Sequence, residues 1–161
     1  MMLLKLGRLV VPLAVLFVVG CQQPVKWSIQ PKVDPDPVKI GKKFTSCCKV
    51  TGELEKISYI AAVPIVAPEF TMELKDEGKE GDAKAGDGIF SVSSTPPAEA
   101  EPGDYEIEFV VYDKNGDPLN VPSFTVLDKE GKVSKEVAPK AEEGKEAEPV
   151  EFSSIIIITL E

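Results

Sequence analysis

The chain has 161 residues and a formal net charge of -9, which is enough material for one ordinary domain and a short leader. It contains no histidine, so catalytic triads of the usual serine or cysteine type are excluded and the commonest transition-metal ligand is missing. Because such an acidic surface repels phosphate backbones, we expect no nucleic acid among the partners.

The first twenty residues have the layout of a secretory signal peptide. Lys5 and Arg8 precede an apolar run, residues 9–19, that is too short to be a comfortable membrane span. A small residue and a cysteine follow this run. The sequence Val18-Val19-Gly20-Cys21 resembles the processing site of bacterial lipoproteins.

This resemblance implies cleavage before Cys21 and lipidation of its thiol, with palmitate among the acyl groups. We then expect a protein of the cell envelope, held at the membrane by its N-terminal lipid, since each buried methylene contributes about 0.8 kcal/mol. Gln22 replaces the aspartate that retains some lipoproteins at the inner membrane, which favours the outer membrane or cell surface. An uncleaved membrane helix and an ordinary secretory signal are the alternatives.

Residues 21–38 contain four prolines after the cysteine and have little regular apolar spacing. Proline fixes φ and favours extended, semi-rigid chain, so we predict a lipidated cysteine followed by a proline-rich tether. Trp27 lies within this segment. Two positions are open for its ring, the membrane interface or the bottom of the folded body.

The remaining residues, 39–161, are predicted to form an all-β domain. Residues 43–50 alternate as a half-buried strand does, with Phe44, Cys48 and Val50 toward the core. Cys47 then points to the opposite face, and adjacent Cα atoms are about 3.8 Å apart, closer than the usual disulfide span of about 4.4 to 6.8 Å. Two free thiols, a strained vicinal bridge and intermolecular pairing all remain open.

Two further segments have strand-like composition. Residues 54–66 are rich in β-branched and aromatic side chains, which predicts one or two strands with Pro64 at an edge or a turn. Residues 70–74 alternate, which predicts a strand with Phe70, Met72 and Leu74 facing inward.

Glycine and carboxylates crowd residues 76–90. Against the twelve-residue calcium loop, Asp76 takes position 1, Glu80 position 5, Asp82 position 7 and Asp87 position 12, with a glycine at position 6. Gly78 departs from the template at position 3. We therefore predict a calcium site of these four carboxylates. The alternative is a solvated turn whose aspartates cap their own backbone amides.

A resemblance to a known type of domain covers residues 40–127. The segments 81–90, 102–105 and 113–116 resemble an immunoglobulin-like module of bacterial exported proteins, which implies an antiparallel β-sandwich. Residues 101–107 are similar to the tyrosine corner that precedes strand F, with Ile107 where antibodies have a cysteine. The antibody inter-sheet disulfide is thus absent.

The C-terminal third contains strands and one long charged segment. Alternation predicts that Tyr105, Ile107, Phe109 and Val111 are buried, and the Asn115-Gly116 pair predicts a turn before a return strand at 123–127. Residues 128–149 lack aromatic side chains and are predicted to be a flexible charged insertion. Four consecutive isoleucines in 151–160 predict a strand covered on both faces.

Together these features predict a lipid-anchored, non-catalytic binding or structural module of immunoglobulin-like fold, with an envelope protein or a glycan as its partner. One alternative is a calcium-stabilised surface adhesion module. The other is a carboxylate-dependent envelope hydrolase that uses a pair such as Glu73 and Asp87.

Overall fold

The computed structural model describes residues 25–79, 82–140 and 147–161. Helical backbone within these ranges is limited to two 3-10 turns, Leu54–Lys56 and Pro68–Phe70, whereas strands run through most of the chain. The all-β prediction is therefore confirmed. The predicted signal peptide, residues 1–20, and Cys21 lie outside the described residues.

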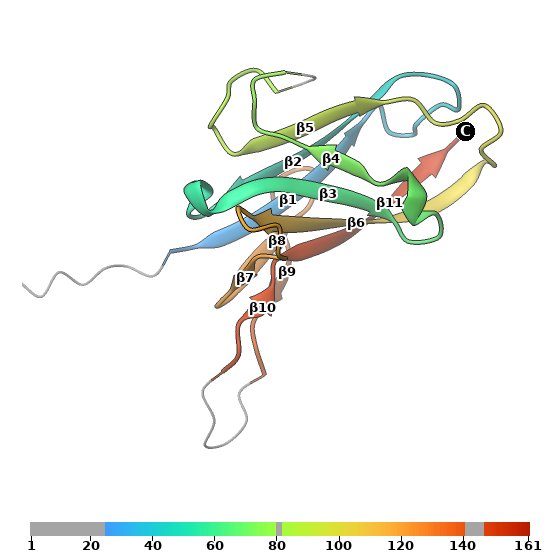
Figure 1. Ribbon diagram of the computed structural model, residues 1–161. Helices are drawn as coiled ribbons and strands as arrows, with labels where there is room; N and C mark the ends of the chain where they lie inside the picture. Colours follow the sequence, from blue (N-terminus) through green and yellow to red (C-terminus); the bar gives the residue numbers. More distant parts are fainter. Residues whose placement is uncertain (1–24, 80–81, 141–146) are drawn as a thin grey trace, which may run out of the picture.

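The strands form two larger sheets and one small one (Figure 1). The five-stranded sheet has the order β5–β2–β1–β8–β9, with bounds Ile89–Ser94, Phe44–Thr51, Trp27–Asp34, Phe124–Leu127 and Val133–Val137. The four-stranded sheet has the order β11–β6–β3–β4, with bounds Ser153–Leu160, Gly103–Asp113, Ile57–Pro64 and Met72–Leu74. β7 (Asn120–Val121) pairs with β10 (Val150–Glu151). Neighbouring strands are antiparallel except β1 and β8, which are parallel.

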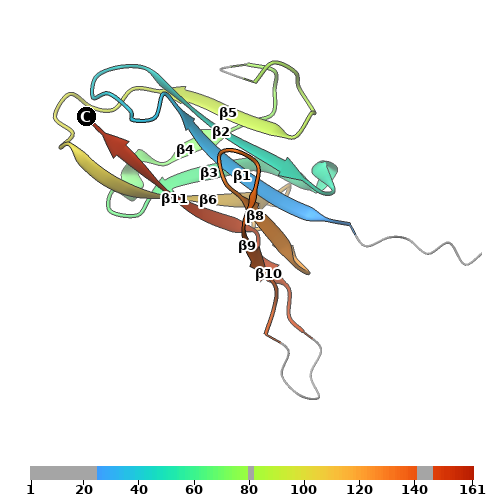
Figure 2. The ribbon, with the colours of Figure 1, turned by 180° about the vertical axis from the view of Figure 1, so that it is seen from behind.

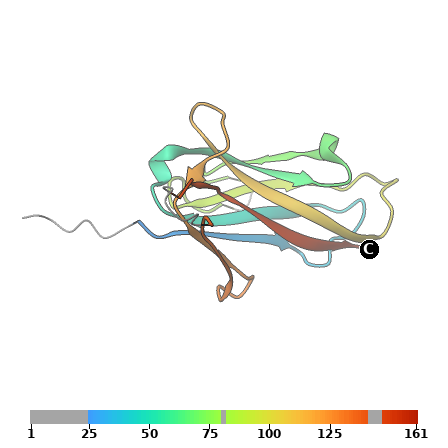
Figure 3. The ribbon, with the colours of Figure 1, turned by 90° about the horizontal axis from the view of Figure 1, so that it is seen from below.

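The two larger sheets lie one above the other, with β3 and β4 above β1 and β2 in Figure 3. Their facing sides supply one continuous hydrophobic core. Its largest fully buried side chains include Phe109 and Phe152 from one side and Ile29 and Val50 from the other. Alternation along each strand explains this, because every second side chain points to the same face. The predicted inward positions Phe44, Cys48 and Val50 are all buried in β2.

Strand β1 corrects the predicted tether. Residues 27–34 belong to the five-stranded sheet, where β1 pairs with β2 over its length and with β8 through Trp27 to Ile29. Pro31 is accommodated because the pairing with β8 stops at Ile29, so the missing N–H of the proline has no partner to lose on that side. Proline content alone was a misleading guide here.

Trp27 takes the second of its two predicted positions. Its side chain is 6% exposed and lies edge-on to Phe152, with ring centroids 5.4 Å apart. The indole ring also rests directly against the backbone at Gly52, where a Cβ would lie 2.2 Å from Trp27 Cε3. Gly52 is therefore the residue that lets the ring into the core.

The predicted strand at 70–74 is shorter than expected. Pro68 begins a 3-10 turn that ends at Phe70, and β4 starts only at Met72. Leu74 is fully buried as predicted, but Phe70 is 53% exposed. The inward prediction for Phe70 was wrong because the turn, and not the strand, sets the direction of its side chain.

The segment after β6 leaves its own sheet. The turn at Asn115-Gly116 forms, but β8 crosses to lie beside β1 in the other sheet (Figure 2).

The predicted flexible insertion, 128–149, is ordered in part, because β9 pairs with β8 over Phe124 to Leu127. An Asp128 turn connects the two strands, and its Oδ1 accepts hydrogen bonds from Glu130 N and Lys132 N. Residues 141–146 lie outside the described ranges.

Strand β11 forms as predicted, but only one of its faces is covered. Ile158 is 7% exposed, whereas Ile155 and Ile157 are 53% and 65% exposed. β11 is the edge of its sheet and pairs only with β6 among the described strands. The consecutive isoleucines therefore do not mark a doubly buried strand.

Candidate functional site

The acidic loop between β4 and β5 carries three of the four predicted calcium ligands in the described residues. Asp76, Asp82 and Asp87 each offer a carboxylate oxygen, and these oxygens lie within 4.8 Å of one another. The fourth predicted ligand, Glu80, lies outside the described residues. The loop thus brings together residues that are six and eleven positions apart in the chain.

Asp76 binds the far end of the loop. Its Oδ1 accepts a hydrogen bond from Gly86 N at 2.5 Å and its Oδ2 accepts one from Gly88 N at 2.8 Å. Gly88 has a φ of +84°, and a Cβ there would lie 2.6 Å from Val50 O. A glycine is required at this turn, because a side chain would be strained at this φ and would clash with Val50 O.

Asp82 is the buried member of the group, at 5% exposure. Its two oxygens accept hydrogen bonds from Gly78 N at 2.6 Å and Lys84 N at 2.9 Å. Ser91 Oγ of β5 donates to Lys79 O at 2.8 Å, which fastens the loop to the outer face of the sheet. The loop is therefore built by its own carboxylates and backbone amides, as the capping alternative predicts.

The same geometry fits calcium in one respect. Oxygens that share a calcium ion lie about 2.3 to 2.6 Å from it, so no two of them are more than about 5 Å apart. The 4.8 Å spread of the three carboxylates meets that limit. Each carboxylate oxygen keeps a free lone pair after accepting one amide hydrogen, and calcium would relieve the mutual repulsion of three close negative charges.

The vicinal cysteines are both free thiols in the structure. Cys48 is fully buried in the core, and Cys47 is half-buried on the opposite face of β2. Burial raises the pKa of both thiols above the ordinary value. Few thiolates therefore form near neutral pH, which makes both side chains poor nucleophiles.

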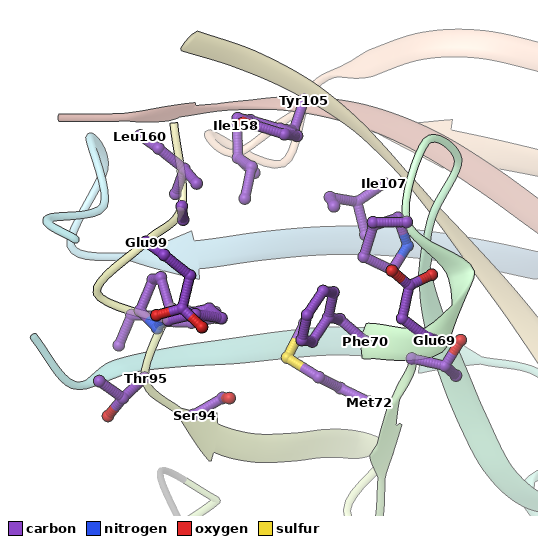
Figure 4. Close-up of a pocket in the computed structure, with 17 residues that line it drawn as sticks. Glu69, Phe70, Met72, Ser94, Thr95, Glu99, Tyr105, Ile107, Ile158 and Leu160 are labelled. Carbon is purple, nitrogen blue, oxygen red and sulfur yellow. The ribbon is translucent and has the colours of Figure 1, made fainter. Parts of the chain in front are cut away.

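A second candidate site is an apolar cavity of about 610 Å³ (Figure 4). It lies beside the ends of β5 and β3, the starts of β2, β4 and β6, and the end of β11. Its apolar lining includes Phe44, Phe70, Met72, Ile107, Ile158 and Leu160. Nothing in the sequence pointed to it, because its residues come from five separate stretches of the chain.

Two carboxylates stand at the cavity and face it from different connections. In Figure 4, Glu99 lies on one side of the cavity, and Glu69 with Phe70 lies on the other. Both glutamates are exposed. Over the part of the chain that the structure covers, neither has a salt bridge or hydrogen bond, and the cavity lining contains no lysine or arginine.

Glu73 and Asp87, the two carboxylates of the hydrolase alternative, each interact with another group. Glu73 Oε1 lies 3.0 Å from Lys75 Nζ, and Asp87 Oδ1 accepts a hydrogen bond from Ile89 N at 3.0 Å. Neither residue lines the cavity. Each carboxylate thus makes a local structural contact.

No described helix is long and apolar enough to cross a membrane. In comparisons with known proteins, no family model, no curated protein and no solved structure matches this chain.

Proposed function

We propose that this chain is an immunoglobulin-like, non-catalytic module of the bacterial cell envelope, anchored through lipid on Cys21. The strand order is the observation that carries the fold part of the proposal. In an immunoglobulin-like sandwich the first, second and fifth strands share one sheet, and the third, sixth and last share the other. The same strands are grouped here, as β1, β2 and β5 in one sheet and β3, β6 and β11 in the other, whereas β4 pairs with β3 instead of joining the sheet of β1, β2 and β5.

A side-chain contact at the start of β6 supports the same fold. Tyr105 Oη donates a hydrogen bond to Glu101 O at 2.8 Å, which is the contact that defines a tyrosine corner before strand F. Two residues later Ile107 is 3% exposed, as the proposed equivalence with the core cysteine of antibodies requires. In this assignment, residues 114–152 are an insertion between strands F and G.

The anchor rests on the sequence Val18-Val19-Gly20-Cys21 and on its distance from the folded body. Only five residues separate Cys21 from the start of β1 at Trp27. An extended chain of that length spans about 20 Å. A lipid on Cys21 would therefore hold the body close to the headgroups, rather than at the end of an eighteen-residue tether.

Metabolic labelling with a palmitate analogue tests the anchor. Bacteria producing the chain are expected to incorporate label and to retain the protein in the membrane fraction. The Cys21→Ser variant should lose both properties. Intact-mass analysis that finds an unmodified thiol on Cys21 in the native protein would refute the anchor.

Crosslinking in intact cells tests whether the body binds an envelope protein or a glycan. Recovery of neither would leave a spacing role.

A calcium-stabilised adhesion module is the second candidate, favoured by the convergence of Asp76, Asp82 and Asp87. A ligand that binds only the native state raises the melting temperature by mass action. We expect millimolar calcium to raise the midpoint and a chelator to lower it. In the Asp87→Asn variant, which keeps an oxygen for Ile89 N, the midpoint should no longer respond to calcium. An unchanged midpoint of the parent chain in calcium would exclude the site.

A further inference from the structure

The apolar cavity exists because the edges of the two larger sheets separate. Lys75 of the segment after β4 and Ser91 of β5 form a bridge, with backbone hydrogen bonds of 3.0 and 3.2 Å that join the two sheet edges at this point. Toward Met72 and Ser94, no bridge joins the described residues of the two edges. The cavity opens there, between the end of β5 and the 3-10 turn before β4.

The interior of the cavity suits an apolar group. Phe44, Ile107 and Ile158 form its wall and are buried at 6%, 3% and 7% exposure. The volume of about 610 Å³ falls in the range of sites that bind small organic molecules, which are mostly apolar with a few placed polar groups. An apolar ligand would thus gain burial without any large rearrangement of the core.

The charged groups at the cavity all have one sign. Glu69 and Glu99 are its only acidic or basic lining residues, and both lack an ion-pair partner in the described chain. Phe70 projects between them as an exposed ring (Figure 4). Carboxylates attract a cation, and the face of an aromatic ring adds to that attraction. An anionic ligand would instead meet two uncompensated negative charges.

We infer that this cavity binds a small organic cation: a molecule with an apolar body that enters the cavity and an ammonium group that stays at the mouth, where Glu69 and Glu99 are the charged groups. The chemistry at the mouth sets the charge of the ligand, and the wall sets its apolar character. This inference does not depend on the lipid anchor or on calcium, because none of their residues line the cavity.

Calorimetric titration of the full-length chain in zwitterionic lipid nanodiscs tests the inference. The probes are 4-phenylbutylammonium, the neutral 4-phenylbutanol and the anionic 4-phenylbutyrate, with empty nanodiscs as the blank. The three share one apolar body and differ in charge. We expect the ammonium to bind most tightly and the carboxylate most weakly.

Two double variants with the same change in net charge locate the binding. Glu69→Gln with Glu99→Gln should weaken the ammonium about tenfold and leave the alcohol unchanged, since each exposed ion pair changes affinity a few-fold. Glu130→Gln with Glu151→Gln removes two exposed carboxylates that do not line the cavity and should change neither affinity.

Three results would overturn the inference. The first is equal affinity for all three probes, which would mean that the mouth does not select charge. The second is an equal loss in both double variants, which would reduce the effect to net charge. The third is no binding of any probe at millimolar concentration.

Discussion

At the level of single residues, two buried serines differ in whether their hydroxyl groups are hydrogen-bonded. Ser46 in β2 is fully buried, and its Oγ has no hydrogen-bond partner in the described structure. Ser91 in β5 is 5% exposed, and its Oγ donates to Lys79 O. A buried hydroxyl without a partner costs its desolvation free energy, whereas a bonded one returns most of that cost.

Replacing each serine by alanine should therefore change stability in opposite directions. Ser46→Ala is expected to raise the free energy of unfolding by about 1 kcal/mol, and Ser91→Ala to lower it by about 1 kcal/mol. Urea denaturation of both variants beside the parent chain measures the difference. A loss of stability in Ser46→Ala would show that its hydroxyl is bonded in solution.

The Cys48 thiol makes stability depend on pH at the alkaline end. Burial raises its pKa well above the ordinary 9.0, so the native state keeps a proton that the unfolded chain releases. Below about pH 8 both states are protonated and the thiol has almost no effect. Above it, the free energy of unfolding should fall by up to about 1.4 kcal/mol per pH unit.

Comparison with Cys48→Ala isolates this contribution, because the other titrating groups are common to both chains. The difference in stability between the parent and the variant should be nearly constant from about pH 7 to 8 and shrink from about pH 8 to 10.5. A difference that does not vary with pH over that range would mean that Cys48 is accessible enough to ionise in the native state.

At the level of elements, β1 is where the sequence was most misleading. Four prolines favoured a tether, yet Ile29 and Val33 alternate with polar residues and are buried. The proline at position 31 is compatible with the sheet because β8 is too short to reach it. The burial of Trp27 in the core outweighs the local preference of the prolines for an unpaired chain. The local sequence does not reveal that core.

A substitution in β1 tests whether this segment is a core strand or a tether. Trp27→Ala should lower the free energy of unfolding by about 3 to 5 kcal/mol, the usual cost of removing a buried tryptophan. Val25→Ala, two residues earlier and 48% exposed, should change it by less than about 0.5 kcal/mol. Equal, small effects of both substitutions on the urea midpoint would contradict the core strand and support the predicted tether.

The two candidate sites differ in how far the sequence predicts them. The loop aspartates stand close together in the chain, so a spacing template predicts the convergence of Asp76, Asp82 and Asp87 from the sequence alone. The cavity required the pairing of strands far apart in sequence, such as β2 with β5 and β6 with β11. Alternation in residues 70–74 predicts β4, but it does not predict the turn that begins at Pro68 and exposes Phe70.

At the level of the whole molecule, the sheets predict an order of local stability. β6 lies between β11 and β3 and carries the fully buried Phe109 and Val111. β9 pairs with β8 alone among the described strands, and its residues are exposed except Val137. Amide hydrogen exchange should therefore be slowest in β6 and fastest, among the strands of the five-stranded sheet, in β9. Protection of β9 equal to that of β1 would indicate an additional contact on its outer edge.

The cavity and the start of the described chain lie at opposite ends of the body. β1 begins at Trp27, whereas the cavity is lined by Leu160 near the C-terminus and by Phe44 at the start of the antiparallel β2 (Figure 1). A strand of eight residues extends about 26 Å. If Cys21 carries the proposed lipid, the anchor and the cavity mouth are at opposite ends of the module, so the anchor leaves the mouth open to a ligand that arrives from the aqueous side.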